Sequence, residues 1–140
     1  MKFSIHKLTL LIFSVTCILA SCSKAPNKIL PKKTGKWNAN ITSHVTATGY
    51  DVTTTKTVAL TFDKAGTGIY SDSSGAAVNF TWSYAKDSKK ITYQKTGSGV
   101  IVFDVSAMEK TTEQWHNVSL EIIAFDTQTT DLTIDLTRAD

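Results

Sequence analysis

Apolar and polar residues alternate along most of the chain after position 36. The pattern is clearest at Val78, Phe80, Trp82 and Tyr84, which single polar residues separate. A period of two places every second side chain on the same face of a β-strand. Further strands are predicted near 37–47, 58–62, 69–70, 91–93, 100–105, 118–122 and 132–136. Since no stretch keeps helical spacing over several turns, we expect an all-β domain of about eight strands.

The connections between these strands are short and rich in turn-forming residues. Segments 63–68, 71–75 and 97–99 combine Gly with Asp or Ser, which suits tight turns between antiparallel strands. Consecutive hairpins with one apolar face are typical of an up-and-down barrel or of a two-sheet sandwich. Segment 106–114 is ambiguous and is compatible with a long loop, a helical turn or the start of a strand.

Residues 1–21 have the layout of a signal peptide. Lys2 and Lys7 precede a mostly apolar run from Leu8 to Leu19, which is short compared with the roughly 20 residues that span a bilayer. The run ends in Leu19-Ala20-Ser21-Cys22, which resembles the lipobox of bacterial lipoproteins. The alternative is an ordinary secreted protein that is cleaved near Ala20 or Ser21.

Cysteine usage favours the lipoprotein interpretation. The sequence has two cysteines, and Cys17 would leave with the signal peptide, so Cys22 would have no intramolecular disulfide partner. A thioether-linked lipid on Cys22 would use the thiol and anchor the protein to a membrane. We therefore expect Cys22 to be lipidated and to become the first residue of the mature protein. The expected location is the cell envelope, on the outer membrane facing the periplasm.

Residues 22–36 are expected to form a basic, extended tether after the lipidated Cys22. This segment holds both prolines of the chain and five lysines, with no acidic residue. The lysines would either lie against anionic headgroups or keep the tether soluble. The remaining domain, 37–140, has 8 basic and 12 acidic residues, so its net charge is about −4. A domain without a basic footprint is not expected to bind nucleic acid.

Two sets of residues carry a family resemblance. Gly35-Lys36-Trp37 resembles the Gly-X-Trp signature of lipocalins. In that family the Trp plugs the closed end of the barrel and an Arg from the last strand packs across it, which implies the same role for Trp37 and Arg138. The segment from Leu60 to Gly68, followed by Phe80-Thr81-Trp82, is similar to the lipocalin-like domains of small Bacteroidetes lipoproteins. The resemblance implies an eight-stranded antiparallel up-and-down barrel and brings no reaction or cofactor with it.

The sequence offers little support for catalysis or metal binding. His44 and His116 are the histidines of the mature chain, and neither has the spacing of a metal site. Gly97-Ser98-Gly99 lacks the Gly-X-Ser-X-Gly pattern of a nucleophile elbow and is typical of a turn. We therefore expect a protein that is not an enzyme and that has neither a metal nor a cofactor.

The remaining candidates for function are aromatic side chains on inward faces. Phe62, Phe80, Trp82, Tyr84 and Phe103 would line a pocket if the barrel is hollow, or form the core if it is filled. For so small a barrel, a filled or nearly filled interior is favoured. The leading hypothesis is a non-catalytic module that binds a small apolar or amphipathic ligand. The alternative is a solid barrel that binds another envelope protein, through the Thr-rich second strand or segment 106–114.

Overall fold

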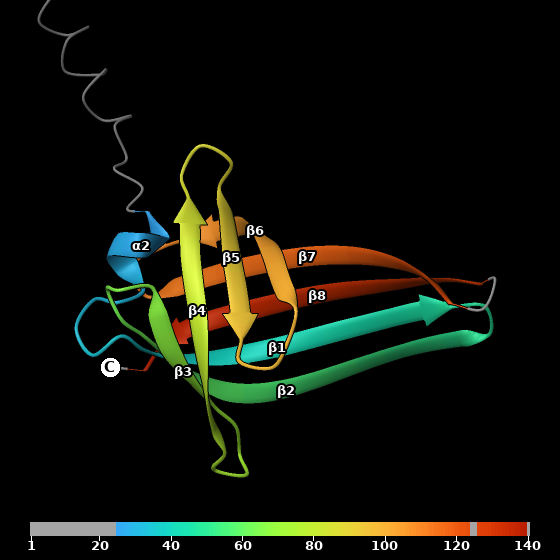
Figure 1. Ribbon diagram of the computed structural model, residues 1–140, viewed down its shortest axis with the longest axis horizontal. Coiled ribbons are helices and arrows are strands. Elements are labelled where there is room, and N and C mark those ends of the chain that lie inside the picture. Colours follow the sequence, from blue (N-terminus) through green and yellow to red (C-terminus); the bar gives the residue numbers. More distant parts are fainter. Residues whose placement is uncertain (1–24, 124–125, 140) are drawn as a thin grey trace, which may run out of the picture.

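The computed structural model describes residues 25–123 and 126–139. Eight strands follow one short helix, and all lie within these ranges (Figure 1). The elements are α2 (Pro26–Ile29), β1 (Lys36–Ala47), β2 (Tyr50–Phe62), β3 (Thr67–Ser71), β4 (Ala77–Ala85), β5 (Lys90–Lys95), β6 (Val100–Met108), β7 (Thr112–Ile123) and β8 (Asp126–Arg138).

The strands form a closed antiparallel barrel in which each strand pairs with its neighbours in the sequence. β1 closes the barrel by pairing with β8, from Trp37 opposite Arg138 to Thr46 opposite Thr129. The predicted all-β, eight-stranded, up-and-down barrel is therefore confirmed. The ambiguous segment 106–114 consists of the end of β6, a turn and the start of β7, with an irregular register between Val105 and Ala107.

The strands differ in length, and this gives the barrel its shape. β3 pairs with β2 only over residues 59–62 of β2, and β6 pairs with β7 only over residues 113–116 of β7. β1, β2, β7 and β8 are much longer and continue past the short strands as a four-stranded sheet (Figure 1). The barrel is thus closed at the α2 end and open where the long strands extend.

The closed end is packed with aromatic side chains. The ring of Phe62 makes edge-to-face contacts with Phe80 at 5.2 Å, Trp82 at 5.4 Å and Trp115 at 5.9 Å between centroids. Edge-to-face pairs of this kind are favoured by the quadrupoles of the rings. All four side chains are buried. This half of the barrel therefore has a solid core.

Arg138 and Trp37 join the last strand to the first at this end. The guanidinium lies 4.4 Å from the centre of the Trp37 ring. The Arg138 guanidinium also donates to the carbonyls of Ile29 and Lys32 at 2.7 Å and of Lys110 at 3.2 and 3.3 Å. A buried cation is tolerated only when its donors are satisfied in this way.

The prediction that residues 22–36 form an extended, solvated tether is wrong for residues 26–31. Pro26 to Ile29 form α2, and Ile29 and Leu30 are 2% and 0% exposed. The Trp37 indole N–H donates to the Leu30 carbonyl at 2.9 Å, and Arg138 binds the carbonyls on either side. The Ile29 and Lys32 carbonyls also accept the backbone N–H groups of Lys32 and Gly35 at 3.1 Å, so Arg138 is a second donor to each of them. Ile29 and Leu30 cover the end of the core. Cys22 lies outside the described residues.

Candidate ligand-binding cavity

A cavity of about 370 Å³ occupies the open half of the barrel. Every strand except β4 contributes to its wall, together with the turn between β5 and β6. Ligand pockets in proteins generally measure about 300–1,000 Å³, so the space is large enough for a small molecule. The interior is thus filled at the closed end and hollow at the open end, which the sequence-based preference for a filled barrel did not foresee.

The deep part of the cavity is apolar. Leu60, Phe103, Trp115 and Ile134 line it and are at most 6% exposed. Phe103 and Trp115 are in contact, with ring centroids 5.9 Å apart. These residues occupy inward positions of β2, β6, β7 and β8, as the two-residue alternation requires.

Two lysines bring positive charge to the outer part of the cavity, which the half-buried Ile41, Ile101 and Leu132 also line. The Lys95 and Lys56 ammonium nitrogens lie 4.9 and 5.7 Å from the centre of the Tyr70 ring. Both distances are within the range of a cation–π interaction. Tyr70, Tyr93, Ser43, Thr54 and Ser98 complete the polar part of the wall. The cavity therefore changes from apolar to cationic between its depth and its mouth.

Tyr93 links the cavity to the solid core. Its ring lies 4.9 Å from that of Phe80, and its side chain also lines the cavity. Burial raises the pKa of the Tyr93 phenol to about 12, with a smaller contribution from Tyr70. The Tyr93 hydroxyl consequently keeps its proton at physiological pH and can donate a hydrogen bond into the cavity.

A buried carboxyl lies beside the cavity-lining Trp115. Glu113 is 2% exposed and its Oε2 accepts a hydrogen bond from the Trp115 indole at 3.0 Å, while its Oε1 has no partner among the described atoms. Burial raises the pKa of Glu113 to about 7, against the opposing effects of the Trp115 hydrogen bond and the Arg138 charge. A side chain of the cavity wall is thus hydrogen-bonded to a titratable carboxyl.

The structure separates the five aromatic residues that the sequence suggested as ligand contacts. Phe103 lines the cavity. Phe62, Phe80 and Trp82 belong to the solid core, where the Trp82 indole donates to the Thr67 carbonyl at 3.2 Å. Tyr84 is half-buried on β4, and burial followed by the Glu113 charge raises the pKa of its phenol. β4 contributes nothing to the cavity wall, so its aromatic residues serve packing.

Lys56, Tyr70, Tyr93 and Lys95 were not singled out from the sequence. A signal for the lysines was nevertheless present. Lys56 is in phase with the inward Val58 and Leu60, and Lys95 is in phase with the inward Ile91 and Tyr93. A lysine at an inward position of a strand breaks the alternation and indicates a cavity or a buried ion.

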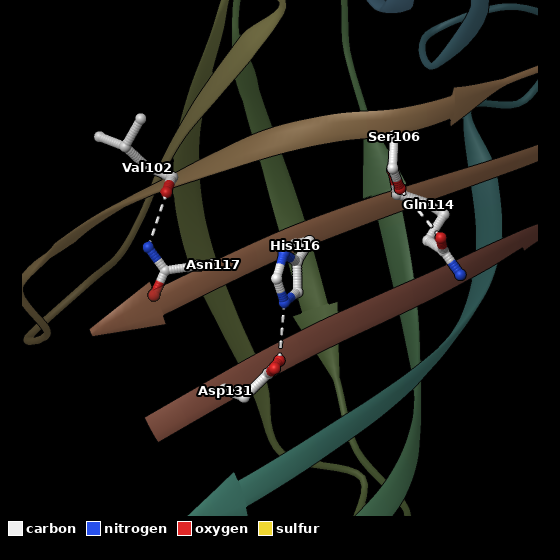
Figure 2. A network of polar contacts seen from close by, with 6 residues as sticks. All are labelled: Val102, Ser106, Gln114, His116, Asn117 and Asp131. Atoms are coloured by element: carbon white, nitrogen blue, oxygen red, sulfur yellow. Dashed lines mark hydrogen bonds and ion pairs between the residues drawn. The ribbon is translucent and has the colours of Figure 1, made fainter. Parts of the chain in front are cut away.

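The two described histidines lie on the outer face. His116 is hydrogen-bonded to Asp131 at 2.8 Å (Figure 2), and His44 is hydrogen-bonded to Asp51 at the same distance. Figure 2 also shows the Asn117 amide donating to the Val102 carbonyl at 2.8 Å, where β6 separates from β7. Within residues 25–123 and 126–139, no group of three or more metal-binding side chains comes together. These polar contacts join neighbouring strands.

Within the same ranges, the structure has no helix of the length and apolarity needed to cross a membrane. A comparison with protein-family models finds no family that matches this chain. Likewise, no curated protein matches the sequence.

Proposed function

We propose that this protein is a lipid-anchored envelope lipoprotein whose barrel binds a small apolar or amphipathic molecule without catalysis. The observation that carries the binding function is the cavity of about 370 Å³ with an apolar depth. Leu60, Phe103, Trp115 and Ile134 would remove the apolar part of a ligand from water. Burial of apolar surface in such a preformed pocket is the usual source of affinity for small ligands.

Uptake of a neutral apolar dye, phenylnaphthylamine, tests this function in a chain of residues 23–140, which contains every described element. The Ser43→Trp variant would place an indole in the cavity, because Ser43 lines it. The Thr42→Trp variant is the matched control, since Thr42 is on the opposite face of β1. We expect the parent chain and Thr42→Trp to bind the dye and Ser43→Trp to lose binding. Equal binding by a folded Ser43→Trp variant would contradict the proposed site.

The lipid anchor is supported by the lipobox-like sequence that ends in Cys22. Labelling of growing cells with a radioactive fatty acid should mark the parent protein but leave the Cys22→Ser variant unlabelled. Fractionation should place the labelled protein in the outer membrane, with protease access from the periplasmic side. A Cys22→Ser variant that remains membrane-bound and labelled would exclude Cys22 as the anchor.

The alternative function, a solid barrel that binds another envelope protein, has less support because the open half of the barrel is hollow. It would use exposed surfaces such as Val118 and Leu120, which are 54% and 67% exposed on β7. Crosslinking in the native membrane distinguishes the two functions. Recovery of a stoichiometric protein partner, together with no dye uptake by the parent chain, would favour the alternative.

A further inference from the structure

We propose that the ligand is an anionic amphiphile, whose acidic head binds between Lys56 and Lys95 while its apolar tail occupies the depth of the cavity. This inference rests on the proposed binding function and specifies the ligand class. The head is a carboxylate or a phosphate, because the oxygens of either group accept hydrogen bonds from ammonium and phenol donors.

The first argument is the position of the two lysines. Lys56 is on β2 and Lys95 is on β5, yet both ammonium groups lie over the same Tyr70 ring, at 5.7 and 4.9 Å from its centre. Both residues line the cavity and occupy inward positions of their strands. Two cations that line one small cavity repel each other, and an anion held by both of them would relieve that repulsion.

The second argument is the absence of a competing carboxylate. Among the side chains that the structure describes, no acidic one lines the cavity. The ion pairs found in residues 25–123 and 126–139 use other groups, such as Lys90 with Asp104 at 2.7 Å. The Ser74 hydroxyl makes the largest contribution to lowering the pKa of Asp72, and the charge of Lys56 makes the smallest. The two ammonium groups are therefore available to a ligand.

The third argument is the direction of the polarity gradient. Trp115 and Phe103 at the depth are 0% and 1% exposed, whereas Lys56 is exposed and Lys95 is half-buried. Tyr93, whose phenol keeps its proton, also lines the cavity. A head that accepts hydrogen bonds would therefore stay at the mouth, and the molecule would enter tail first.

Calorimetry with probes of equal tail length tests the charge of the head. Undecanoate, decyl phosphate, decanol and decylammonium carry the same ten-carbon tail and differ only at the head, and each would be titrated into the chain of residues 23–140. We expect at least one of the two anions to bind about tenfold more tightly than decanol, a difference of about 1.4 kcal/mol. Decylammonium should bind more weakly than decanol. Preference for undecanoate would identify a carboxylate source, and preference for decyl phosphate would identify a phosphate source.

The Lys56→Met and Lys95→Met double variant removes both charges and keeps the apolar stems. It should lose about tenfold in affinity for the preferred anion and keep its affinity for decanol. Lys86→Met is the control, because Lys86 is exposed in the turn between β4 and β5 and does not line the cavity. Equal binding of anions and decanol, unaffected by the double variant, would overturn this inference and leave the apolar cavity function intact. No binding of any probe, the neutral dye included, would instead overturn the binding function itself.

Discussion

Glu113 illustrates how one buried residue can make the stability of the barrel depend on pH. Its carboxyl has a pKa of about 7 in the folded protein and an ordinary value of 4.5. The folded state therefore holds this proton more tightly than the unfolded state does. Between pH 4.5 and about 7 folding takes up a proton, so the free energy of unfolding falls as pH rises through this window. Above the window the contribution is constant.

The Glu113→Gln variant should remove this dependence, because an amide does not ionise. The difference in unfolding free energy between parent and variant should change by about 3 kcal/mol across the window. Urea denaturation at a series of pH values measures it, and taking the difference cancels the contributions of groups that the two proteins share. Glu109→Gln is the control, since Glu109 is exposed in the turn between β6 and β7. A pH dependence that survives in Glu113→Gln would assign it to another group.

Gly68 is required by close packing. A Cβ at this position would lie 2.2 Å from the Phe80 ring and 2.3 Å from the Thr61 carbonyl oxygen. Gly68→Ala should therefore lower the free energy of unfolding by about 1–3 kcal/mol, the usual cost of overpacking. Thermal or urea denaturation measures the change.

The matched control for Gly68 is Gly99→Ala. A Cβ at Gly99 meets nothing within 4 Å, and the Gly99 backbone is outside the left-handed region. The stability of Gly99→Ala should stay within about 0.5 kcal/mol of the parent. If the two variants lost similar amounts of unfolding free energy, the close contacts at Gly68 would not explain why glycine is needed at this position.

At the residue scale, the sequence predicted the partners at the closed end better than the contacts of the cavity. Gly35 has φ = +66° and approaches the backbone of Phe62, which explains why the signature begins with glycine. The Trp37–Arg138 contact lies where the family resemblance implies. Phe62 and Phe103, by contrast, both fall at inward positions of the alternating pattern of their strands. Their depth in the barrel depends on strand pairing, so the sequence could not separate core from cavity wall.

At the element scale, α2 is the feature that composition concealed. Lysines and prolines dominate its neighbourhood and predicted a solvated chain. However, Ile29 and Leu30 supply two adjacent apolar side chains that cover the end of the barrel. A pattern of two residues is too short for a periodicity argument. The position of Ile29 and Leu30 depends on the hydrogen bonds that Trp37 and Arg138 donate to their carbonyls, and Arg138 is more than 100 positions away in the sequence.

Leu30→Ala tests whether α2 is part of the folded domain. Leu30 is completely buried, so its truncation should lower the free energy of unfolding by about 2–5 kcal/mol. Lys28→Ala, at an exposed position of α2, should change it by less than about 0.5 kcal/mol. Chemical denaturation of the two variants measures the difference. If residues 25–36 were a solvated tether, the two substitutions would have equal effects.

At the scale of the whole molecule, α2 and the tip of the β1–β2 hairpin lie at opposite ends of the long axis (Figure 1). β1 alone has 12 residues, which corresponds to a length of about 40 Å. In the sequence, Cys22 precedes Ala25 by three positions, a reach of at most about 11 Å. A lipid on Cys22 would therefore hold the closed end of the barrel near the membrane. With the long axis upright on the membrane, the hairpin tip would lie about 40 Å farther away.

Fluorescence quenching tests this orientation in vesicles that contain the lipidated protein and a nitroxide-labelled lipid. A dye attached to Lys110→Cys, in the turn beside Arg138, should be quenched strongly. A dye attached to Thr48→Cys, in the β1–β2 turn, should be quenched weakly. Comparable quenching at the two sites would contradict anchoring through Cys22 or the orientation that follows from it.

The pairing of β1 with β8 also has a consequence for how quickly the protein folds. Each hairpin forms between strands that are close in sequence, whereas Arg138 binds carbonyls 106 and 109 positions earlier in the chain. The entropy lost on closing so long a loop is recovered only when both ends are in place, and topologies with such contacts fold slowly. The hairpins should therefore form early, and the pairing of β1 with β8 should form last. Until β1 pairs with β8, the edges of both strands are exposed to proteases and to other chains. The protein is therefore most prone to proteolysis and aggregation before this last step of folding.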